Sequence, residues 1–278
     1  FRLAYRLYRE YMKGGMIKDI VREAVFSYKG TARRARDITL GLLESYGNAK
    51  GHLFYKVINA AKNEEILKNV FHKEIQDLAI VFCVLFEYSD EGMQSCMLKN
   101  ETVKRWGVDP EELVSTAMAN TERLLPMEMK PLDDVVAEIM EKSRHEIPEE
   151  ARKYFENEMN MEVPKVCLVT NRAGLNGFSA VFYRDVLKRL AERFSSDLYI
   201  LPCSIHEALV FPADEKVRAG NLAEIVAEVN RDCVVPEEYL SDSVYYYDYM
   251  QDDFRIVATT RATKTGYMDP DRIENSVG

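Results

Sequence analysis

Two short apolar runs, each closed by a proline, most constrain what this chain can fold into. They are residues 198–201, before Pro202, and residues 208–211, before Pro212. Runs of four residues fit buried strands, whereas a helix needs ten or more. Proline has no N–H to donate and stops the pairing of a strand. The sequence therefore predicts two neighbouring strands, joined by a loop at residues 203–207.

A helix and a hairpin are predicted to follow these strands. Asn221 stands where a helix N-cap belongs, with Glu224 three residues later. The next apolar residues recur at the spacing of one helix face, and they are Leu222, Ile225, Val226 and Val229. Residues 243–247 include three consecutive tyrosines and have the composition of a strand. Residues 254–257 are the expected hairpin partner, with the turn at residues 251–253.

The upstream half mixes helical and strand signals. Residues 78–86 form a nearly unbroken apolar run that suits a central strand buried on both faces. Asp109 followed by Pro110 predicts a helix start, with the Asp as N-cap. Another amphipathic helix is expected at 133–142. Further on, we expect residues 178–183 to pair back as a hairpin strand.

These elements predict the α+β class: N-terminal helices, then mixed or antiparallel sheets packed by helices in two subdomains. Residues 1–142 would hold a helical arm and the first subdomain. The charged segment 143–163 is the expected linker. Residues 164–258 would form the second subdomain, and 259–278 a peripheral tail.

Several segments together carry a resemblance to a known family. They read DLYILPCSIHEALVFP, VVPEEYLSDSVYYYD, NEEILKNVFHKEIQDLAIVF and WGVDPEELVSTAMANTERLLP. With them the chain resembles a bacterial family described only as domain of unknown function 5688, over most of residues 50–258. A weaker likeness links the pattern to a second uncharacterised family, number 1444. Phe71 departs from the pattern, which has a proline before His72. The resemblance implies a fold and a bacterial origin, and no activity.

Charge is distributed unevenly along the chain. Residues 1–36 contain ten Lys and Arg against three acidic residues, whereas the whole chain has a formal charge of −9. The acidic body argues against broad nucleic-acid binding, because phosphate contacts need positive surface. The basic arm leaves two interpretations open. It could touch nucleic acid or anionic lipid weakly, or its charges could form a solvated face that complements the acidic body, which we favour.

Cysteine content and hydropathy point to a cytoplasmic protein without a membrane span. The five cysteines are odd in number and show no metal-ligand spacing, which favours reduced thiols in the cytoplasm. No apolar stretch approaches about 18 residues, the length of a membrane-spanning helix. The first residue is Phe and already lies in a helical pattern. We therefore expect the natural protein to begin upstream, where a signal peptide or a functional segment could lie.

Catalytic signals are weak. Ser204, His206 and Glu207 lie together in the loop between the two proline-closed runs, where they could serve proton transfer. The alternative, which we favour, is a polar turn whose side chains cap backbone donors. No histidine pair has metal-ligand spacing and no glycine pattern fits a phosphate loop, so neither a metal nor a cofactor is expected. Four aspartates around the tyrosine strand could hold a cation, although solvated turns favour such residues.

Two functions from different classes remain. We favour a non-catalytic interaction or accessory module, for which a protein partner is compatible with the sequence. The alternative is a metal-independent hydrolase or transferase that uses His206 with a carboxylate from another segment. Substrate, partner, oligomeric state and biological process lie beyond the sequence.

Overall fold

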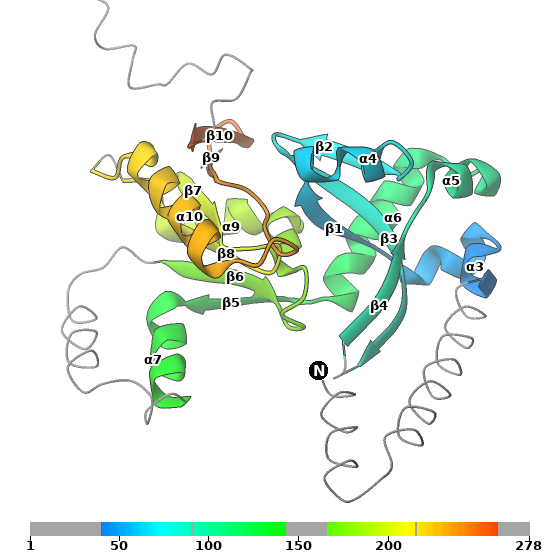
Figure 1. Cartoon of the computed structure of the whole chain (residues 1–278), viewed down its shortest axis with the longest axis horizontal. Coiled ribbons are helices and arrows are strands. Elements are labelled where there is room, and N and C mark those ends of the chain that lie inside the picture. Colours follow the sequence, from blue (N-terminus) through cyan, green and yellow to red (C-terminus); the bar gives the residue numbers. More distant parts are fainter. Residues whose placement is uncertain (1–39, 90–91, 143–165, 215, 261–278) are drawn as a thin grey trace, which may run out of the picture.

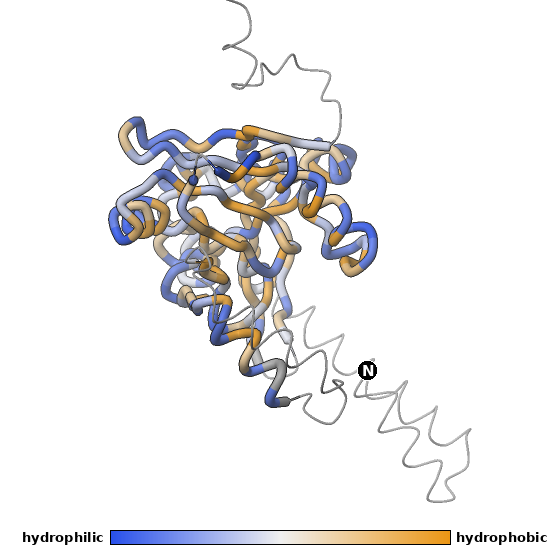
Figure 2. Tube along the Cα trace, turned by 90° about the vertical axis from the view of Figure 1, so that its left-hand side faces the viewer, coloured by the Kyte–Doolittle hydropathy of each residue, from blue (hydrophilic) through white to orange (hydrophobic). Residues whose placement is uncertain are grey.

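A computed structural model describes residues 40–89, 92–142, 166–214 and 216–260. Within these residues the chain forms two antiparallel sheets, each packed by helices (Figure 1). The α+β prediction is therefore confirmed. Hydrophobic residues follow the inner elements, and hydrophilic residues lie on the outer turns (Figure 2). The predicted arm, the linker and nearly all of the predicted tail lie outside the described residues.

The first sheet is built around one long strand. Its strands are β1 (Leu53–Asn59), β2 (His72–Ile75), β3 (Leu78–Ser89) and β4 (Gly92–Met97). β3 pairs with β1 along one edge, while β2 and β4 share its other edge. The apolar run at residues 78–86 is thus the central strand that its composition predicts.

Five short helical segments and one longer helix, α6, belong to the first sheet's half of the chain. They are α3 (Tyr46–Ala49), η1 (Lys50–His52), η2 (Ala61–Asn63), α4 (Glu64–Leu67), α5 (Asn100–Trp106) and α6 (Pro110–Leu124). α6 begins as predicted, since the Asp109 side chain accepts a hydrogen bond from the N–H of Glu111. Leu113 and Ala117 of α6 are buried in the main core with residues of both sheets.

The second sheet has six strands in the order β10-β9-β7-β8-β6-β5. Their bounds are β5 (Met127–Pro131), β6 (Cys167–Asn171), β7 (Leu198–Pro202), β8 (Ala208–Pro212), β9 (Ser243–Asp248) and β10 (Asp253–Thr259). The two proline-closed runs are β7 and β8, paired as neighbours. The predicted hairpin is β9 and β10.

Helices cover both faces of the second sheet. The remaining elements are α7 (Leu132–Lys142), η3 (Gly177–Phe182), α9 (Val186–Phe194) and α10 (Ala219–Cys233). α9 packs in the main core with Leu198 and Ile200 of β7. α10 packs against the opposite face, in a separate cluster with Leu201 and Phe211. Because side chains alternate along a strand, β7 serves both clusters.

The two sheets share one core. The main cluster contains Tyr55 and Phe82 of the first sheet together with Tyr245 of the second. β5 precedes the predicted linker, yet it pairs with β6, which follows it. The proposed boundary at 143–163 stays a prediction, and the pairing of β5 places one strand from before it in the second sheet.

Two local predictions are wrong. Residues 178–183 were expected as a hairpin strand, but they lie mainly in the 3-10 helix η3. Residues 177–181 are all buried, which the alternating exposure of a hairpin strand would not allow. Asn221 is not the N-cap of its helix, because α10 begins at Ala219 and Arg218 is the capping position. The N–H of Asn221 instead donates to the carbonyl of Arg218.

Candidate functional site

The loop between β7 and β8 holds the three candidate residues predicted from the sequence. It closes on itself through a bond of 3.1 Å from the N–H of Cys203 to the carbonyl of Glu207. Within it, the Ser204 hydroxyl accepts the backbone N–H of His206 at 2.9 Å. Ser204 is buried, and its oxygen shapes the turn. This is the local capping role that serine often takes in loops.

The His206 ring is held on both sides. Its Nδ1 accepts a hydrogen bond of 3.1 Å from the N–H of Asn176. A backbone N–H only donates, so Nδ1 carries no proton in this geometry, and the neutral ring holds its proton on Nε2. That nitrogen lies 3.5 Å from Oε1 of Glu238. The imidazole therefore links the segment of Asn176 to the segment of Glu238, and its acceptor nitrogen, Nδ1, already has a hydrogen-bond donor.

Glu238 reaches the loop from the segment between α10 and β9. Its carbonyl accepts the N–H of Ile205 at 2.8 Å, and its carboxylate faces His206. The His206 side chain is 23% exposed and that of Glu238 is 47% exposed. The hydrolase or transferase hypothesis requires a carboxylate from another segment beside His206. Glu238 is such a carboxylate, and it is partly exposed to solvent.

Close backbone packing fixes the other side of the loop. The Thr170 hydroxyl donates to the His206 carbonyl at 2.8 Å, and the N–H of Phe178 donates to the Ile205 carbonyl. A Cβ atom at Gly177 would overlap the Thr170 hydroxyl and the His206 carbonyl. Glycine is needed there because no side chain fits between the start of η3 and this loop.

The loop also contains Cys203, but its thiol is held in the unreactive, protonated form. Burial, together with the negative charge of Glu207, raises the pKa of Cys203 to about 12. Nucleophilic attack requires the thiolate, so this thiol is inert near neutral pH. Glu207 itself is half-buried. Ser204, His206 and Glu207 thus lie together, but the Nδ1 lone pair of His206 is taken by the Asn176 N–H. Among the described residues, no hydrogen bond joins the Ser204 hydroxyl to the His206 ring, as a nucleophile–base pair would require.

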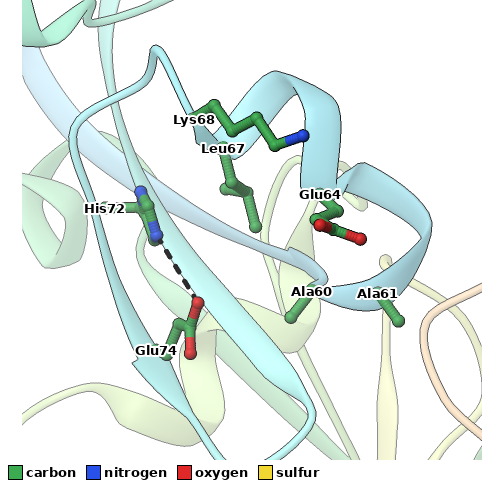
Figure 3. Close-up of a pocket in the computed structure, with 7 residues that line it drawn as sticks. All are labelled: Ala60, Ala61, Glu64, Leu67, Lys68, His72 and Glu74. Atoms are coloured by element: carbon green, nitrogen blue, oxygen red, sulfur yellow. Dashed lines mark ion pairs between the residues drawn. The ribbon is translucent and has the colours of Figure 1, made fainter.

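A second site, which the sequence did not indicate, is a shallow pocket of about 370 Å³ between α4 and β2 (Figure 3). Its lining is Ala60, Ala61, Glu64, Leu67, Lys68, His72 and Glu74. His72 and Glu74 stand two apart on β2 and so share a face, with Nε2 and Oε1 3.7 Å apart. The spacing of two positions between His72 and Glu74 is the sequence signal that could have indicated this pocket. His72 Nδ1 bonds the Val70 carbonyl at 2.7 Å, so Nδ1 carries the proton.

Phe71, where the resemblance predicts a proline, directly precedes His72 of this pocket. Phe71 donates its N–H to the Leu98 carbonyl at 2.8 Å, a bond that proline could not make. Its ring packs on Phe82 with the centroids 5.3 Å apart. Phenylalanine therefore ties the segment before β2 to β3 and to the end of β4.

The aspartates around the tyrosine hairpin each have a protein partner. Asp248 accepts the N–H of Gln251 at 2.9 Å, and Asp252 accepts the Tyr247 hydroxyl at 2.6 Å. Asp253 pairs with Arg255 at 2.7 Å. The fourth, Asp242, accepts the Asn230 side chain at 2.9 Å. Across the described ranges, no three His, Cys, Asp or Glu side chains are grouped to hold a metal ion.

Comparison with known protein families gives a match over most of the chain. The sequence profile of a family of unknown function, DUF5688, matches residues 4–249. No curated protein and no solved structure matches the chain significantly. The match extends the resemblance seen in the sequence toward the N-terminus, into the basic arm. The likeness to family 1444 stays a prediction. Within the part of the chain that the structure describes, no helix is long and apolar enough to cross a membrane.

Proposed function

We propose that this chain, which belongs to the family of unknown function DUF5688, is a non-catalytic protein-interaction module of the bacterial cytoplasm. One observation carries the proposal. In the loop with the strongest catalytic signal, the Ser204 oxygen and the His206 Nδ1 both accept backbone N–H groups. A serine nucleophile donates its proton to the free lone pair of a base, and the Nδ1 lone pair of His206 is already occupied by the Asn176 N–H.

An interaction role is supported by apolar side chains that the fold leaves in solvent. Ile225 is 54% exposed, Val229 is 41% exposed and Val235 is 49% exposed. All three lie on α10 or directly after it. Clustered exposed apolar residues are typical of surfaces that contact another protein.

The cytoplasmic assignment is supported by the cysteines. All five are described and all are free. Burial raises the pKa of Cys83 to about 12, which keeps that thiol protonated and unreactive. Free thiols are the rule in the cytoplasm, where disulfides are rare.

The test combines an activity screen with three variants. The purified chain and the variants Ser204→Ala, His206→Gln and Glu238→Gln are assayed against ester, phosphoester and glycoside substrates. We expect no turnover above buffer for any of them. We also expect His206→Gln to lower the unfolding midpoint, because the ring holds Asn176 and Glu238. Turnover by the wild type that His206→Gln abolishes would overturn the non-catalytic assignment.

A hydrolase or transferase using His206 is the second candidate, favoured by the position of Glu238. This carboxylate comes from another segment and lies 3.5 Å from Nε2. Under this hypothesis Glu238 orients the ring, and a substrate would displace the Asn176 N–H from Nδ1. Glu238→Gln would then reduce kcat and change the pH profile of the same screen, whereas an interaction module shows neither effect.

A further inference from the structure

α10 carries two apolar rows, and the fold covers only one of them. Ala223 and Val226 are buried against the second sheet. Ile225 and Val229 are one helical turn apart on a different side, and both are exposed. Leu222 lies half-buried between the two rows. We call Leu222, Ile225 and Val229 the α10 stripe.

Acidic residues border the α10 stripe on its solvent side. Glu228 follows Ile225 by three positions, and Asp232 follows Val229 by three, so each is a surface neighbour of the apolar row. Both are exposed, and Asp232 pairs only with the adjacent, exposed Arg231 among the ion pairs of the described residues. The surface thus combines an apolar row with a negative border.

The first 29 residues carry the complementary pattern in their sequence. Their apolar residues recur at helical spacing, and they include Leu3, Leu7, Tyr8 and Tyr11. The residues between them are basic, and they include Arg2, Arg6, Arg9 and Lys13. The family profile begins at residue 4, so this arm is part of the family's common region.

We infer that residues 1–29 of a second copy of this chain dock on the α10 stripe, a step that rests on the proposed interaction role. Leucines and tyrosines of the arm cover Ile225 and Val229, and its arginines face Glu228 and Asp232. An arm exchanged in both directions closes a two-fold dimer, in which each copy both gives and receives an arm.

The position at which the described chain begins favours a second copy over the arm of the same chain. Leu43 accepts the Trp106 indole N–H at 3.1 Å, and Tyr46 bonds Thr116 at 3.1 Å. These contacts hold the start of the described chain against α5 and α6. α3 and α10 lie toward opposite ends of the molecule (Figure 1). The described chain therefore begins at the end of the molecule opposite its own α10 stripe.

Disulfide trapping tests the docking directly, because Cys233 is exposed one turn beyond Val229. In the full chain, Leu7→Cys is oxidised under mild conditions and separated on a non-reducing gel. We expect a covalent dimer that disappears when Cys233→Ala is added. A crosslink confined within one chain, or no crosslink at all, would overturn the inference.

Sedimentation of the wild type, Val229→Glu and Ile66→Glu is the second part of the test. Val229→Glu should raise the dimer dissociation constant about 30-fold, because an apolar contact is replaced by a charge. Ile66→Glu is the matched control, since Ile66 is 43% exposed on α4 of the first sheet, and it should leave the constant unchanged. High salt should weaken the dimer, because the acidic border is exposed.

Different outcomes would overturn the docking of a second copy and the interaction role on which it rests. A monomeric wild type whose binding to a different host protein is blocked by Val229→Glu removes the second copy and leaves the interaction module in place. A monomeric wild type that binds a polynucleotide through the arm overturns the docking of the arm. A monomer that captures no host protein, with or without Val229→Glu, overturns both.

Discussion

The hydroxyl of Tyr245 donates to the carboxylate of Asp77 across 168 positions of sequence, at 2.7 Å. Asp77 lies in the β2–β3 turn of the first sheet, whereas Tyr245 lies in the middle of β9 in the second. The other carboxylate oxygen accepts the hydroxyls of Ser241 at 2.5 Å and Ser243 at 2.9 Å. One aspartate therefore ties the two sheets together through three hydroxyl donors. Burial and the nearby Asp77 charge hold the pKa of Tyr245 well above its usual value.

Removing this acceptor should destabilise the whole molecule. We expect Asp77→Ala to lower the free energy of unfolding by about 2–4 kcal/mol, because three donors lose a charged partner. Tyr245→Phe should cost about 1–2 kcal/mol. Urea unfolding of both single variants and the double variant gives the coupling energy, expected at about 1–2 kcal/mol.

Tyr246→Phe serves as the control for that cycle. Tyr246 donates to Asp197 at 2.6 Å, inside the second sheet. Its effect should add to that of Asp77→Ala within about 0.5 kcal/mol. Full additivity between Asp77→Ala and Tyr245→Phe would show that the bond between the sheets contributes nothing to stability.

The close approach at Gly177 gives a second prediction. Gly177→Ala places a Cβ against the Thr170 hydroxyl and the His206 carbonyl, and it should cost about 2–4 kcal/mol, because backbone must shift. Gly220→Ala is the matched control, since no atom lies within 4 Å of a Cβ added in that first turn of α10. It should stabilise the protein by about 0.5–1 kcal/mol. Equal thermal midpoints for the two variants would refute the close packing.

The buried thiol of Cys83 makes stability depend on alkaline pH. Burial raises the folded-state pKa of Cys83 from 9.0 to about 12. Above pH 9 the unfolded chain therefore loses this proton first, and the contribution is present below pH 9 and lost as pH rises toward 12. The slope from this group approaches about 1.4 kcal/mol per pH unit.

Cys83→Ala should reduce the slope of the wild type, as measured by denaturant unfolding between pH 9 and 10. The slope that remains comes from the other thiols with a raised pKa, such as Cys203. This window lies below the usual pKa of tyrosine, so the buried tyrosines contribute little to it. Val81→Ala opens a cavity in the same cluster without removing a titrating group, and it should keep the wild-type slope. An unchanged slope in Cys83→Ala would contradict the raised pKa.

Helix capping provides a paired test of local sequence signals. Asp109→Ala should cost about 0.5–1 kcal/mol, because the side chain accepts the Glu111 N–H at the start of α6. Asn221→Ala should leave stability within about 0.5 kcal/mol or raise it slightly, since Asn221 lies inside α10. Chemical denaturation of both variants decides the matter, and a larger loss at Asn221 would reverse the assignment.

The sequence predicted best where the signal was local. The proline stops delimit β7 and β8, the long apolar run is β3, and Asp109 caps α6, because each depends on residues a few positions apart. Prediction was wrong at residues 178–183, an apolar run that tertiary packing turned into η3. There Tyr55 of β1 donates its hydroxyl to the Ser179 carbonyl at 3.0 Å, a partner that no local pattern announces.

The candidate site was also predictable only in its local part. Ser204, His206 and Glu207 were recognisable as a polar loop between two strands, because neighbours in sequence stay neighbours in space. The tertiary structure alone decided which atoms remain available: Asn176 takes the His206 acceptor and Glu238 faces its other nitrogen. It also decided that Ile225 and Val229 face solvent while Val226 is buried. Helical spacing orders these residues around an axis, but only packing against the sheet determines which side is covered.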